Sequence, residues 1–485
     1  MTTVTDPIKP IEIAVVGGGI SGATAALTLA EMGLNVTVFE RNTSLVSGPP
    51  ICHLHAGGNL YREISEQQCL TLLRQSIDTV KLFKHTLNIR PTVIAVPHSD
   101  PGEADAIIPR LKVVKASYQT LVDQDASNEV LGLPEDYYRL YSKEELLGLR
   151  NKVQPVTPVS FDEWMIPFAQ HANLETLKYP VVAVQEYGWS VFRLSASANL
   201  ALEQLKNCQL YLNTGVNRIE ASGSQWVVNF THADGVQTQR RFDYLINACG
   251  FETGIVDDWA NAPRQRLVEF KAAYVTQWTQ CNQEWPEVIF HGPRGTPQGM
   301  AQLTPYPNGH FQLHGMTEDI TLFRDGLVSS SNDSSQPELP SLLQRKVKRG
   351  WTTTEFELRT KNAIDHMAQF IPDFEQALGE GKPLFGAQQI PGDNVTLRAA
   401  DVSFSGQNYA RLEVVKGSSA LDASNKVVEH MVKSGLLKAN ALSPTEYKTT
   451  MSLTSDQVEK KAEYLAQLRG YPVALAQIPK TNSAS

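Results

Sequence analysis

A glycine-rich turn between a short apolar strand and a helix constrains the fold of this chain more than any other feature. Residues 11–40 read IEIAVVGGGISGATAALTLAEMGLNVTVFE. The pattern predicts a buried strand at 11–16, a turn at 17–22, a helix at 23–32 and a second strand at 35–39 that is closed by Glu40. Such a unit is typical of a doubly wound α/β fold that binds a dinucleotide at the helix N-terminus. The sequence therefore predicts a bound dinucleotide.

Each glycine of the turn has its own physical role in this prediction. Gly17 permits the tight turn, Gly19 lets the backbone approach a pyrophosphate, and Gly22 lets the helix pack closely on the strand. The helix N-terminus beside Ser21 offers amide donors and the positive end of the helix dipole to phosphates. Glu40 follows Gly22 by 18 residues and is predicted to accept hydrogen bonds from ribose hydroxyls.

Length and composition indicate a large globular enzyme. The chain has 485 residues, more than the ~250–300 that one hydrophobic core usually serves, so we expect two to three domain-sized units. Hydrophobic residues make up 42% and charged residues 19% of the chain, values that argue against global disorder and against an integral membrane protein. The net charge of −8 argues against nucleic acid as a partner, because no basic face is evident that neutralises phosphates.

The cysteines and the first residues indicate a reducing compartment. The five cysteines are odd in number and widely spaced, with no CxxC pair, so free thiols are expected and no metal centre. The opening residues MTTVTDPIKP lack the basic and apolar regions of a secretory signal. We therefore expect a cytoplasmic protein.

The order of the predicted elements divides the chain into discontinuous domains. Apolar spacing predicts a helix at 65–87 capped by Ser65, a helix near 194–205 and a buried parallel strand at 244–248. The expected fold class is α/β, with a Rossmann-like domain that combines a parallel sheet with an antiparallel meander and an α+β domain with a mixed or antiparallel sheet. We assign residues 1–87, 188–261 and 385–435 to the dinucleotide-binding domain, 88–187 and 262–384 to the substrate domain, and 436–485 to a C-terminal helical tail.

The order of these pieces resembles the flavoprotein superfamily that contains D-amino-acid oxidase, glycine oxidase, 2-hydroxyglutarate dehydrogenase and malate:quinone oxidoreductase. Within it the chain is most similar to the malate:quinone oxidoreductases, and the resemblance covers most of residues 11–431. It is carried by residues 17–40, the loop 55–58, the strand end 247–250, the strand 309–315, the segments 96–98 and 386–389, and the closing sequence GSSALDAS at 417–424.

The resemblance implies FAD bound in an extended form. It places Gly17, Gly19 and Gly22 at the pyrophosphate, Glu40 on the adenosine ribose, Val216 near adenine, and Gly250 and Gly417, Ser418 and Ser419 on the flavin side, with Ser21, Arg41, His55, Gly57 and Lys416 as further cofactor contacts. Asp422 departs from the pattern of the malate enzymes and brings a carboxylate into the closing sequence. It would change the substrate charge preference if its helix faces the flavin.

The implied reaction is removal of a hydride from a small 2-hydroxy acid, malate-like or 2-hydroxyglutarate-like, with electrons passed to quinone, oxygen or another acceptor. The base for the hydroxyl proton is predicted to be His55, His53 or His314. For His55 a structural hydrogen bond or a covalent flavin link is an equal interpretation. The predicted carboxylate clamp is a cation near a family-like turn: Arg398, Arg193, Arg324 or Lys416.

Other functions fit parts of the sequence. An amino-acid or amine oxidase of the same superfamily needs the same elements. An NADPH-dependent flavin monooxygenase shares the first motif, but Pro391-Gly392-Asp393-Asn394 is a poor candidate for its second one. A nicotinamide dehydrogenase leaves the later glycine-rich elements without a role, and a degenerate flavin-binding module is the non-enzyme alternative. Any membrane contact is expected to be peripheral.

Overall fold

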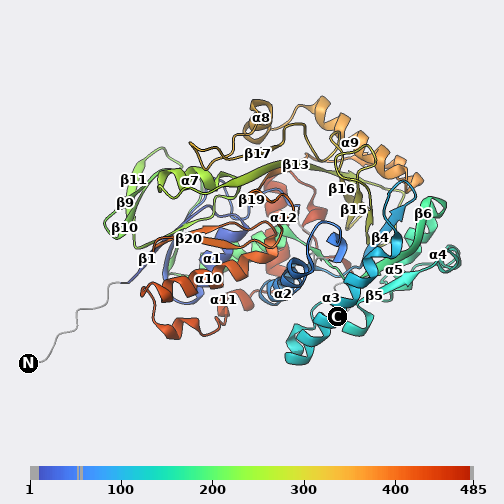
Figure 1. The fold of residues 1–485 in the computed structure, drawn as a ribbon, viewed down its shortest axis with the longest axis horizontal. Coiled ribbons are helices and arrows are strands. Elements are labelled where there is room, and N and C mark those ends of the chain that lie inside the picture. Colours follow the sequence, from blue (N-terminus) through green and yellow to red (C-terminus); the bar gives the residue numbers. More distant parts are fainter. Residues whose placement is uncertain (1–9, 52–53, 55–57, 481–485) are drawn as a thin grey trace, which may run out of the picture.

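The two largest sheets in the computed structural model, which describes residues 10–51, 54 and 58–480, organise the molecule (Figure 1). The first is a six-stranded sheet in the order β20-β21-β12-β1-β2-β8, in which only β20 is antiparallel to its neighbour. Its strands are β1 (Glu12–Val16), β2 (Asn35–Phe39), β8 (Cys208–Tyr211), β12 (Tyr244–Asn247), β20 (Val402–Ser405) and β21 (Tyr409–Leu412).

Continuous apolar runs place β1 and β12 at the centre of this sheet. All four residues of β12 are buried, as are the last four of β1, because helices or other strands cover both faces. The buried parallel strand predicted at 244–248 is therefore confirmed. Helix α1 (Ile20–Glu31) connects β1 to β2 and is buried from Ser21 to Ala30 beneath α6 (Val191–Gln204) and α10 (Ala420–Lys433).

Helix ends follow local capping. The predicted helix at 65–87 is α2 (Glu66–Leu82), and the Ser65 hydroxyl accepts a hydrogen bond from the Gln68 amide at 3.3 Å. It ends earlier than predicted, because Phe83 leaves the helical backbone and a short turn leads into β3 (Leu87–Asn88), which pairs with β7 (Gly188–Trp189). Helix α6 begins three residues before the predicted start because Ser190 caps it.

The antiparallel meander is also present. Strands β9 (Gly215–Ser222), β10 (Gln225–Thr231) and β11 (Gln237–Phe242) form a separate three-stranded sheet at the left of Figure 1. Its buried side chains, among them Ile219, Trp226 and Phe230, pack with β1, β2 and β12. The parallel sheet and the meander together confirm the predicted Rossmann-like architecture.

The second large sheet has ten strands and arches over the right and top of Figure 1. Strands β14 and β4 are parallel and the other pairs are antiparallel, so the sheet is mixed, as predicted. Its strands are β4 (Thr92–Pro97), β5 (Tyr138–Tyr141), β6 (Leu177–Val184), β13 (Arg266–Gln277), β14 (Glu287–Phe290), β15 (Ala301–Tyr306), β16 (His310–Gly315), β17 (Leu327–Ser329), β18 (Leu378–Gly379) and β19 (Leu384–Pro391).

Strand β19 connects the two large sheets along the chain. It pairs with β13 in the ten-stranded sheet, from Leu384 opposite Ala273 to Pro391 opposite Arg266. The sequence interpretation assigned residues 385–435 to the dinucleotide-binding domain, whereas β19, which covers 384–391, pairs within the other sheet. The domain boundary near residue 385 remains a prediction.

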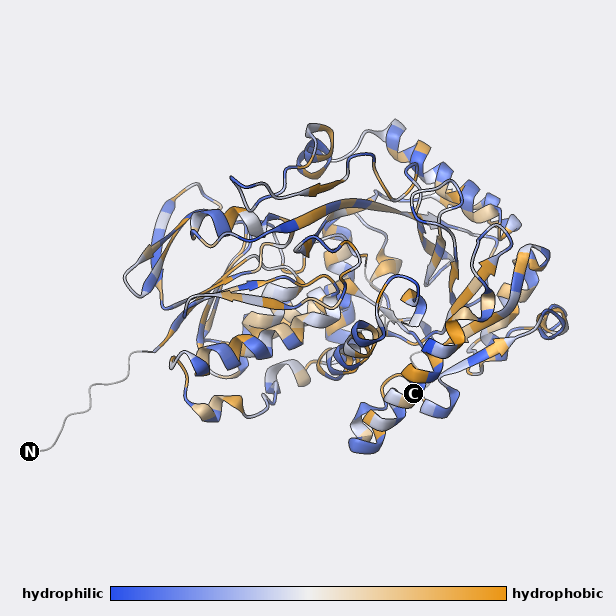
Figure 2. Cartoon of the chain, in the orientation of Figure 1, coloured by the Kyte–Doolittle hydropathy of each residue, from blue (hydrophilic) through white to orange (hydrophobic). Residues whose placement is uncertain are grey.

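Helices cover the outer face of the ten-stranded sheet and the remaining surfaces. Figure 2 shows hydrophilic and hydrophobic residues alternating along the outer helix α9, whose Ala363, Ile364 and Met367 are buried. Among the described residues no helix is both long and apolar enough to span a membrane. The remaining helices are α3 (Ile108–Gln124), α4 (Lys143–Leu149), α5 (Phe161–His171), α7 (Thr253–Trp259), α8 (Ser341–Arg349), α9 (Thr353–Ala368), α11 (Lys448–Met451) and α12 (Ser455–Leu468).

A buried ionic cluster joins the two large sheets. Asp257 of α7 forms ion pairs with Arg266 of β13 and with Arg411 of β21, where Arg411 Nε lies 2.7 Å from Asp257 Oδ1. The Tyr409 hydroxyl donates to the same carboxylate at 2.6 Å. Because both arginines and the aspartate are buried, this cluster fixes one sheet relative to the other.

Candidate functional site

One cavity of about 1640 Å³ lies between the two large sheets. This is larger than the ~300–1,000 Å³ of an ordinary small-molecule pocket, so it has room for a large ligand and a second small one. Most of the predicted site residues that the structure describes line it: Gly17, Gly19, Ser21, Glu40, Arg41, Val216, Gly250, His314, Arg398, Lys416 and Gly417.

The glycine turn forms a cradle that side chains would fill. Gly17 has a φ of +97°, and a Cβ there would lie 2.4 Å from the Ala248 carbonyl oxygen. A Cβ on Gly22 would lie 1.9 Å from the Gly17 carbonyl oxygen, whereas one on Gly19 would meet nothing within 4 Å. No side chain caps α1, so its first amides are available to a ligand. This arrangement fits a dinucleotide pyrophosphate.

Glu40 is fixed at the end of β2. Its Oε2 accepts the Gly18 amide at 2.8 Å, and its Oε1 accepts the Asn42 amide at 2.8 Å and the Asn42 side-chain amide at 2.7 Å. The Ser47 hydroxyl adds a longer bond of 3.3 Å. The carboxylate therefore holds both the turn and the following loop, while its predicted contact with a ribose remains a prediction.

An ion pair lies beside the same end of the cavity. Arg41 Nη1 lies 2.6 Å from Glu252 Oε2, which joins the loop after β2 to the turn after β12. Val216 and Gly250 line this end as well. Glu40 and Val216, predicted at the adenosine, therefore line one cavity from distant segments of the chain, and Gly250, predicted on the flavin side, lines it as well.

The closing strand-to-helix turn is only partly exposed to the cavity. Lys416 and Gly417 line it, whereas Ser418 and Ser419 face α2. The Thr79 hydroxyl donates to the Ser418 carbonyl at 3.0 Å, and the Ser419 hydroxyl donates to Gln75 Oε1 at 2.6 Å. The two serines therefore fix the turn against α2, on the side away from the cavity.

The predicted bases are described only in part. His53, His55 and Gly57 lie outside the described residues. His314 lies on β16, is 9% exposed and lines the cavity, and its Nδ1 is 3.3 Å from the Gln312 side-chain nitrogen. Its role as a base remains a prediction.

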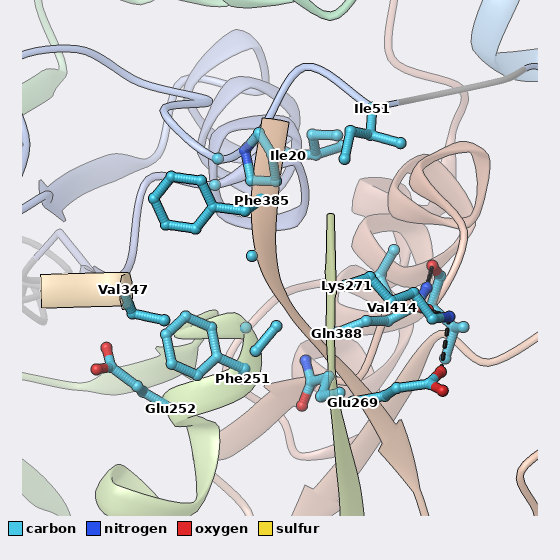
Figure 3. A pocket seen from close by; sticks show the side chains of 18 of the residues that line it. Ile20, Ile51, Phe251, Glu252, Glu269, Lys271, Val347, Phe385, Gln388 and Val414 are labelled. Carbon is cyan, nitrogen blue, oxygen red and sulfur yellow. Dashed lines mark hydrogen bonds and ion pairs between the residues drawn. The ribbon is translucent and has the colours of Figure 1, made fainter. Parts of the chain in front are cut away.

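Charged side chains of β13 form a wall that the sequence interpretation missed. Lys271 Nζ lies 2.7 Å from Glu269 Oε2, and Arg294 forms an ion pair with the other oxygen of the same carboxylate. Lys271 Nζ also donates to Gln388 Oε1 at 3.2 Å (Figure 3). The available signal was the sequence VEFKA, in which a glutamate and a lysine alternate with apolar residues, as expected where one face of a strand is polar.

Arg398 lies close to this charged wall. Its guanidinium donates to the carbonyls of Val395 and Leu397, at 2.8 and 2.9 Å. Burial lowers the pKa of Arg398, while the nearby Glu269 and Glu63 raise it. Burial raises the pKa of the Glu63 carboxyl, which also lines the cavity. This part of the wall therefore places cations where a carboxylate ligand would be stabilised.

His291 is a further ionisable group of the cavity that sequence reasoning missed. It follows β14, is 7% exposed, and its ring contacts the Tyr61 ring with the centroids 5.5 Å apart. Its Nε2 has no hydrogen-bond partner among the described residues. Burial, reinforced by Arg62, lowers the pKa of His291 to about 4, so the ring is neutral near pH 7.

Three other charged candidates lie away from the cavity. Arg193 is buried and donates to the carbonyls of His85 and Leu87, at 2.9 and 3.4 Å, so it holds a loop and cannot clamp a substrate in this cavity. Arg324 is exposed. Asp422 lies 3.0 Å from Lys426 and accepts from Gln75 at 3.1 Å, so its helix does not present it to the cavity.

The C-terminal segment, to which the sequence interpretation gave no chemistry, reaches the cavity. Arg469 lines it and donates to the carbonyls of Val46, Ser47 and Gly48, with lengths of 3.2 Å to Val46 and 2.9 Å to Ser47. The guanidinium also lies over the Phe192 ring, 4.9 Å from its centroid. Arg469 thus holds the loop that follows Glu40.

Apolar side chains line another part of the cavity. Figure 3 shows Phe251, Val347 and Phe385, which come from the turn after β12, from α8 and from β19. All three are partly buried and pack against the cluster around Val268 and Phe270. The cavity therefore joins a cradle for phosphates, a cationic wall and an apolar wall.

Comparisons with known proteins agree with the predicted FAD-binding fold. The model of the family described as FAD dependent oxidoreductase matches residues 12–380. No curated protein sequence matches the chain.

Solved structures with a similar fold include three flavoproteins. Glycine oxidase from Geobacillus kaustophilus is 14% identical with a TM-score of 0.54, over 89% of this chain and 95% of that one. Glycerol-3-phosphate dehydrogenase from Bacillus halodurans, complexed with FAD, is 13% identical with a TM-score of 0.56, over 96% and 77%. L-alpha-glycerophosphate oxidase from Mycoplasma pneumoniae, with FAD bound, is 17% identical with a TM-score of 0.54, over 89% and 96%.

Proposed function

The chain belongs to the family of FAD-dependent oxidoreductases, and from that premise we propose that it oxidises a small 2-hydroxy acid, malate-like or 2-hydroxyglutarate-like, and passes the electrons to quinone or another acceptor. FAD, when bound, supplies the capacity to accept two electrons and a hydrogen from carbon. The similarity to malate:quinone oxidoreductases remains part of this proposal. So does a cytoplasmic location with at most peripheral membrane contact.

The observation that carries the proposal is the cationic wall within the cavity of the glycine turn. Arg294, Arg398 and Lys416 supply positive charge there, and Lys271 adds to it when it is protonated, against the carboxylates of Glu63 and Glu269. A substrate carboxylate that pairs with these cations would be held at a fixed place. The carbon next to the carboxylate would then be oriented for the reaction. A neutral alcohol would form no ion pair with the same wall.

An apolar acceptor is supported by the wall of Phe251, Val347 and Phe385. A quinone ring stacks or packs on aromatic and aliphatic side chains without needing charge. We therefore propose that a quinone approaches from this side. Oxygen is the other acceptor considered.

An amino acid is the second candidate substrate. Structures of similar fold include a glycine oxidase from Geobacillus kaustophilus and an L-proline dehydrogenase from P. horikoshii. Glu63 and Glu269 place carboxylates in the same cavity, where an ammonium group would find a partner. The measurement below separates the two substrate classes.

The test is an anaerobic absorbance spectrum of the purified protein before and after addition of 2-hydroxy acids, amino acids and, separately, NADPH. Bleaching of the flavin band by a 2-hydroxy acid is the expected result. Bleaching by amino acids alone would favour the second candidate, and bleaching by NADPH alone would indicate a monooxygenase. A flavin band that no compound bleaches would contradict the proposal and favour a binding module.

The acceptor is tested on the enzyme after reduction by its substrate. We expect a short-chain ubiquinone analogue to restore the flavin band faster than air-saturated buffer does. Replacing Val347 with Asp, which puts a charge on the apolar wall, should slow reoxidation by the quinone and leave reoxidation by oxygen unchanged. Equal slowing of both would contradict the quinone route.

A further inference from the structure

We propose that Lys271, which lies on β13 and lines the cavity, accepts the hydroxyl proton of the substrate. The inference rests on the proposed function, because it needs a 2-hydroxy acid in the cavity. Lys271 lies in the middle of β13, opposite Gly386 of β19, and its side chain lines the cavity. It is the lysine that β13, the longest strand of the ten-stranded sheet, presents to this space.

The hydrogen bonds of Lys271 connect it to the turn expected beside the flavin. Its Nζ donates to Gln388 Oε1 at 3.2 Å, and the side-chain nitrogen of Gln388 donates to the Val415 carbonyl at 2.7 Å. Val415 directly precedes Lys416 and Gly417, which line the cavity. Gln388 therefore holds the amine at a fixed distance from the segment where the substrate and the cofactor are predicted to meet.

The surroundings of Lys271 favour the neutral amine more than the surroundings of an exposed lysine do. Burial lowers the pKa of Lys271, Arg294 and Arg398 lower it further, and Glu269 raises it without restoring the ordinary value. Arg294 lies in the loop after β14, Arg398 lies in the loop before β20, and Glu269 lies on β13. A lysine with a depressed pKa and a hydrogen-bonded position is a suitable general base.

Glu269, His291 and the arginines beside Lys271 are poorer bases. Burial alone raises the pKa of the Glu269 carboxyl, but Lys271 and Arg294 outweigh burial and hold it below its usual range. The pKa of His291 is about 4, so its ring binds a proton weakly. Arginine does not release its proton in proteins. Among Lys271, Glu269, His291 and the arginines, Lys271 is thus the group whose proton affinity suits the reaction.

The step balances in atoms and electrons. The C–H bond of carbon 2 breaks and its hydrogen leaves with both electrons for the oxidised flavin. The O–H bond breaks, its proton goes to Lys271 Nζ, and its electron pair forms the C=O bond of a 2-keto acid. The substrate loses two electrons, which FAD would accept when bound, and the lysine later returns its proton to water.

The test compares wild type with Lys271→Met and Lys271→Arg by the anaerobic rate of flavin bleaching from pH 6 to 10. In wild type the rate should rise about tenfold per pH unit below the pKa of Lys271 and then level off, since only the neutral amine accepts a proton. Both variants should lower the plateau by about a hundredfold or more and lose this rise. Arginine keeps the charge but cannot act as a base, so it separates proton transfer from electrostatics.

A second measurement does not depend on turnover. Propionate lacks the reacting hydroxyl, and its binding is followed by the change in the flavin spectrum. Wild type should bind it more weakly above the pKa of Lys271, where a positive charge is lost, and Lys271→Met should lose this pH dependence. Lys361→Met and Lys361→Arg, at an exposed lysine of α9, are the matched controls and should behave as wild type.

Glu269→Gln keeps Lys271 and tests its ionisation directly. Removing the carboxylate that stabilises the ammonium form should move the rise in rate to lower pH. If the Lys271 variants do not hold FAD, this shift of the pH profile tests the role of Lys271 in their place. A Lys271→Arg enzyme within threefold of wild type, or an unmoved profile in Glu269→Gln, would overturn the proposal for Lys271 alone. Wild-type flavin that no 2-hydroxy acid bleaches would overturn the proposed function, and this inference with it.

Discussion

At the scale of single residues, the environment of a charged group decides what it can do. Arg398 and Arg193 are both arginines near family-like turns, and both were candidates for the carboxylate clamp, with Arg398 assigned to the site. Arg193 is enclosed by carbonyls of its own domain, whereas Arg398 lines the cavity beside Glu269 and Glu63. Only the second has a charge that a ligand in the cavity can use.

Replacing Arg398 with Met should raise the KM for a carboxylate substrate by roughly tenfold to a hundredfold, because a hydrogen bond to a charged partner contributes about 1.5–3 kcal/mol. Steady-state kinetics with the substrate identified by flavin bleaching gives the value. Arg324→Met, at an exposed arginine, is the matched control and should leave KM unchanged. An equal rise in both variants would show that Arg398 does not bind the substrate.

His291 should make the stability of the protein depend on pH. Its pKa is about 4 in the folded chain against 6.5 for the ordinary group, so between these values the unfolded chain binds the extra proton. Stability contributed by the neutral ring is therefore complete above pH 6.5 and is lost as the pH falls, by about 2 kcal/mol at pH 5. The midpoint of thermal unfolding should fall less between pH 7 and 5 in His291→Gln than in wild type or in His98→Gln, an exposed control.

At the scale of elements, the sequence pattern predicted those turns, caps and strands that depend on interactions between residues close together in the chain. The glycine turn, the cap at Ser65 and the apolar strand β12 were predicted because each depends on neighbours in sequence. Lys271 and Arg469 were missed because their partners lie far along the chain, at Gln388 and at the carbonyls of residues 46–48. Sequence spacing carries no signal for such pairings. The sequence therefore indicated many of the residues that line the cavity, including His314 and Arg398, but not the contacts that Lys271 and Arg469 make across it.

Arg469 ties the C-terminal segment to the loop after Glu40, and its loss should release that loop. Arg469→Met removes three hydrogen bonds to carbonyls, each contributing about 0.5–1.5 kcal/mol, and should weaken FAD binding about tenfold or more. Fluorescence of the released flavin on dilution measures the affinity. Lys460→Met, at an exposed residue of α12, the helix that ends just before Arg469, should bind FAD as wild type does. Unchanged affinity in Arg469→Met would show that the loop holds its shape without the C-terminal segment.

At the scale of the whole molecule, the two large sheets depend on the buried cluster of Asp257, Arg266 and Arg411. Asp257→Asn leaves two buried guanidinium groups without their counter-charge and should lower the free energy of unfolding by about 3–5 kcal/mol. Thermal unfolding, with FAD retention measured in parallel, checks this. Asp258→Asn, at the exposed neighbour on the same helix, should cost far less. Similar losses in both variants would mean that the cluster does not join the sheets.

The cavity takes its walls from almost the full length of the chain, from Val16 at the end of β1 to Tyr471 after α12. The glycine turn and the segments that enclose it, the turn at Lys416 and the contacts of Arg469 with the loop after Glu40, lie far apart in the sequence. The pocket is therefore closed only in a chain that contains all of these segments, and a fragment that ends before Lys416 would keep the sequence of the glycine turn without the enclosed pocket.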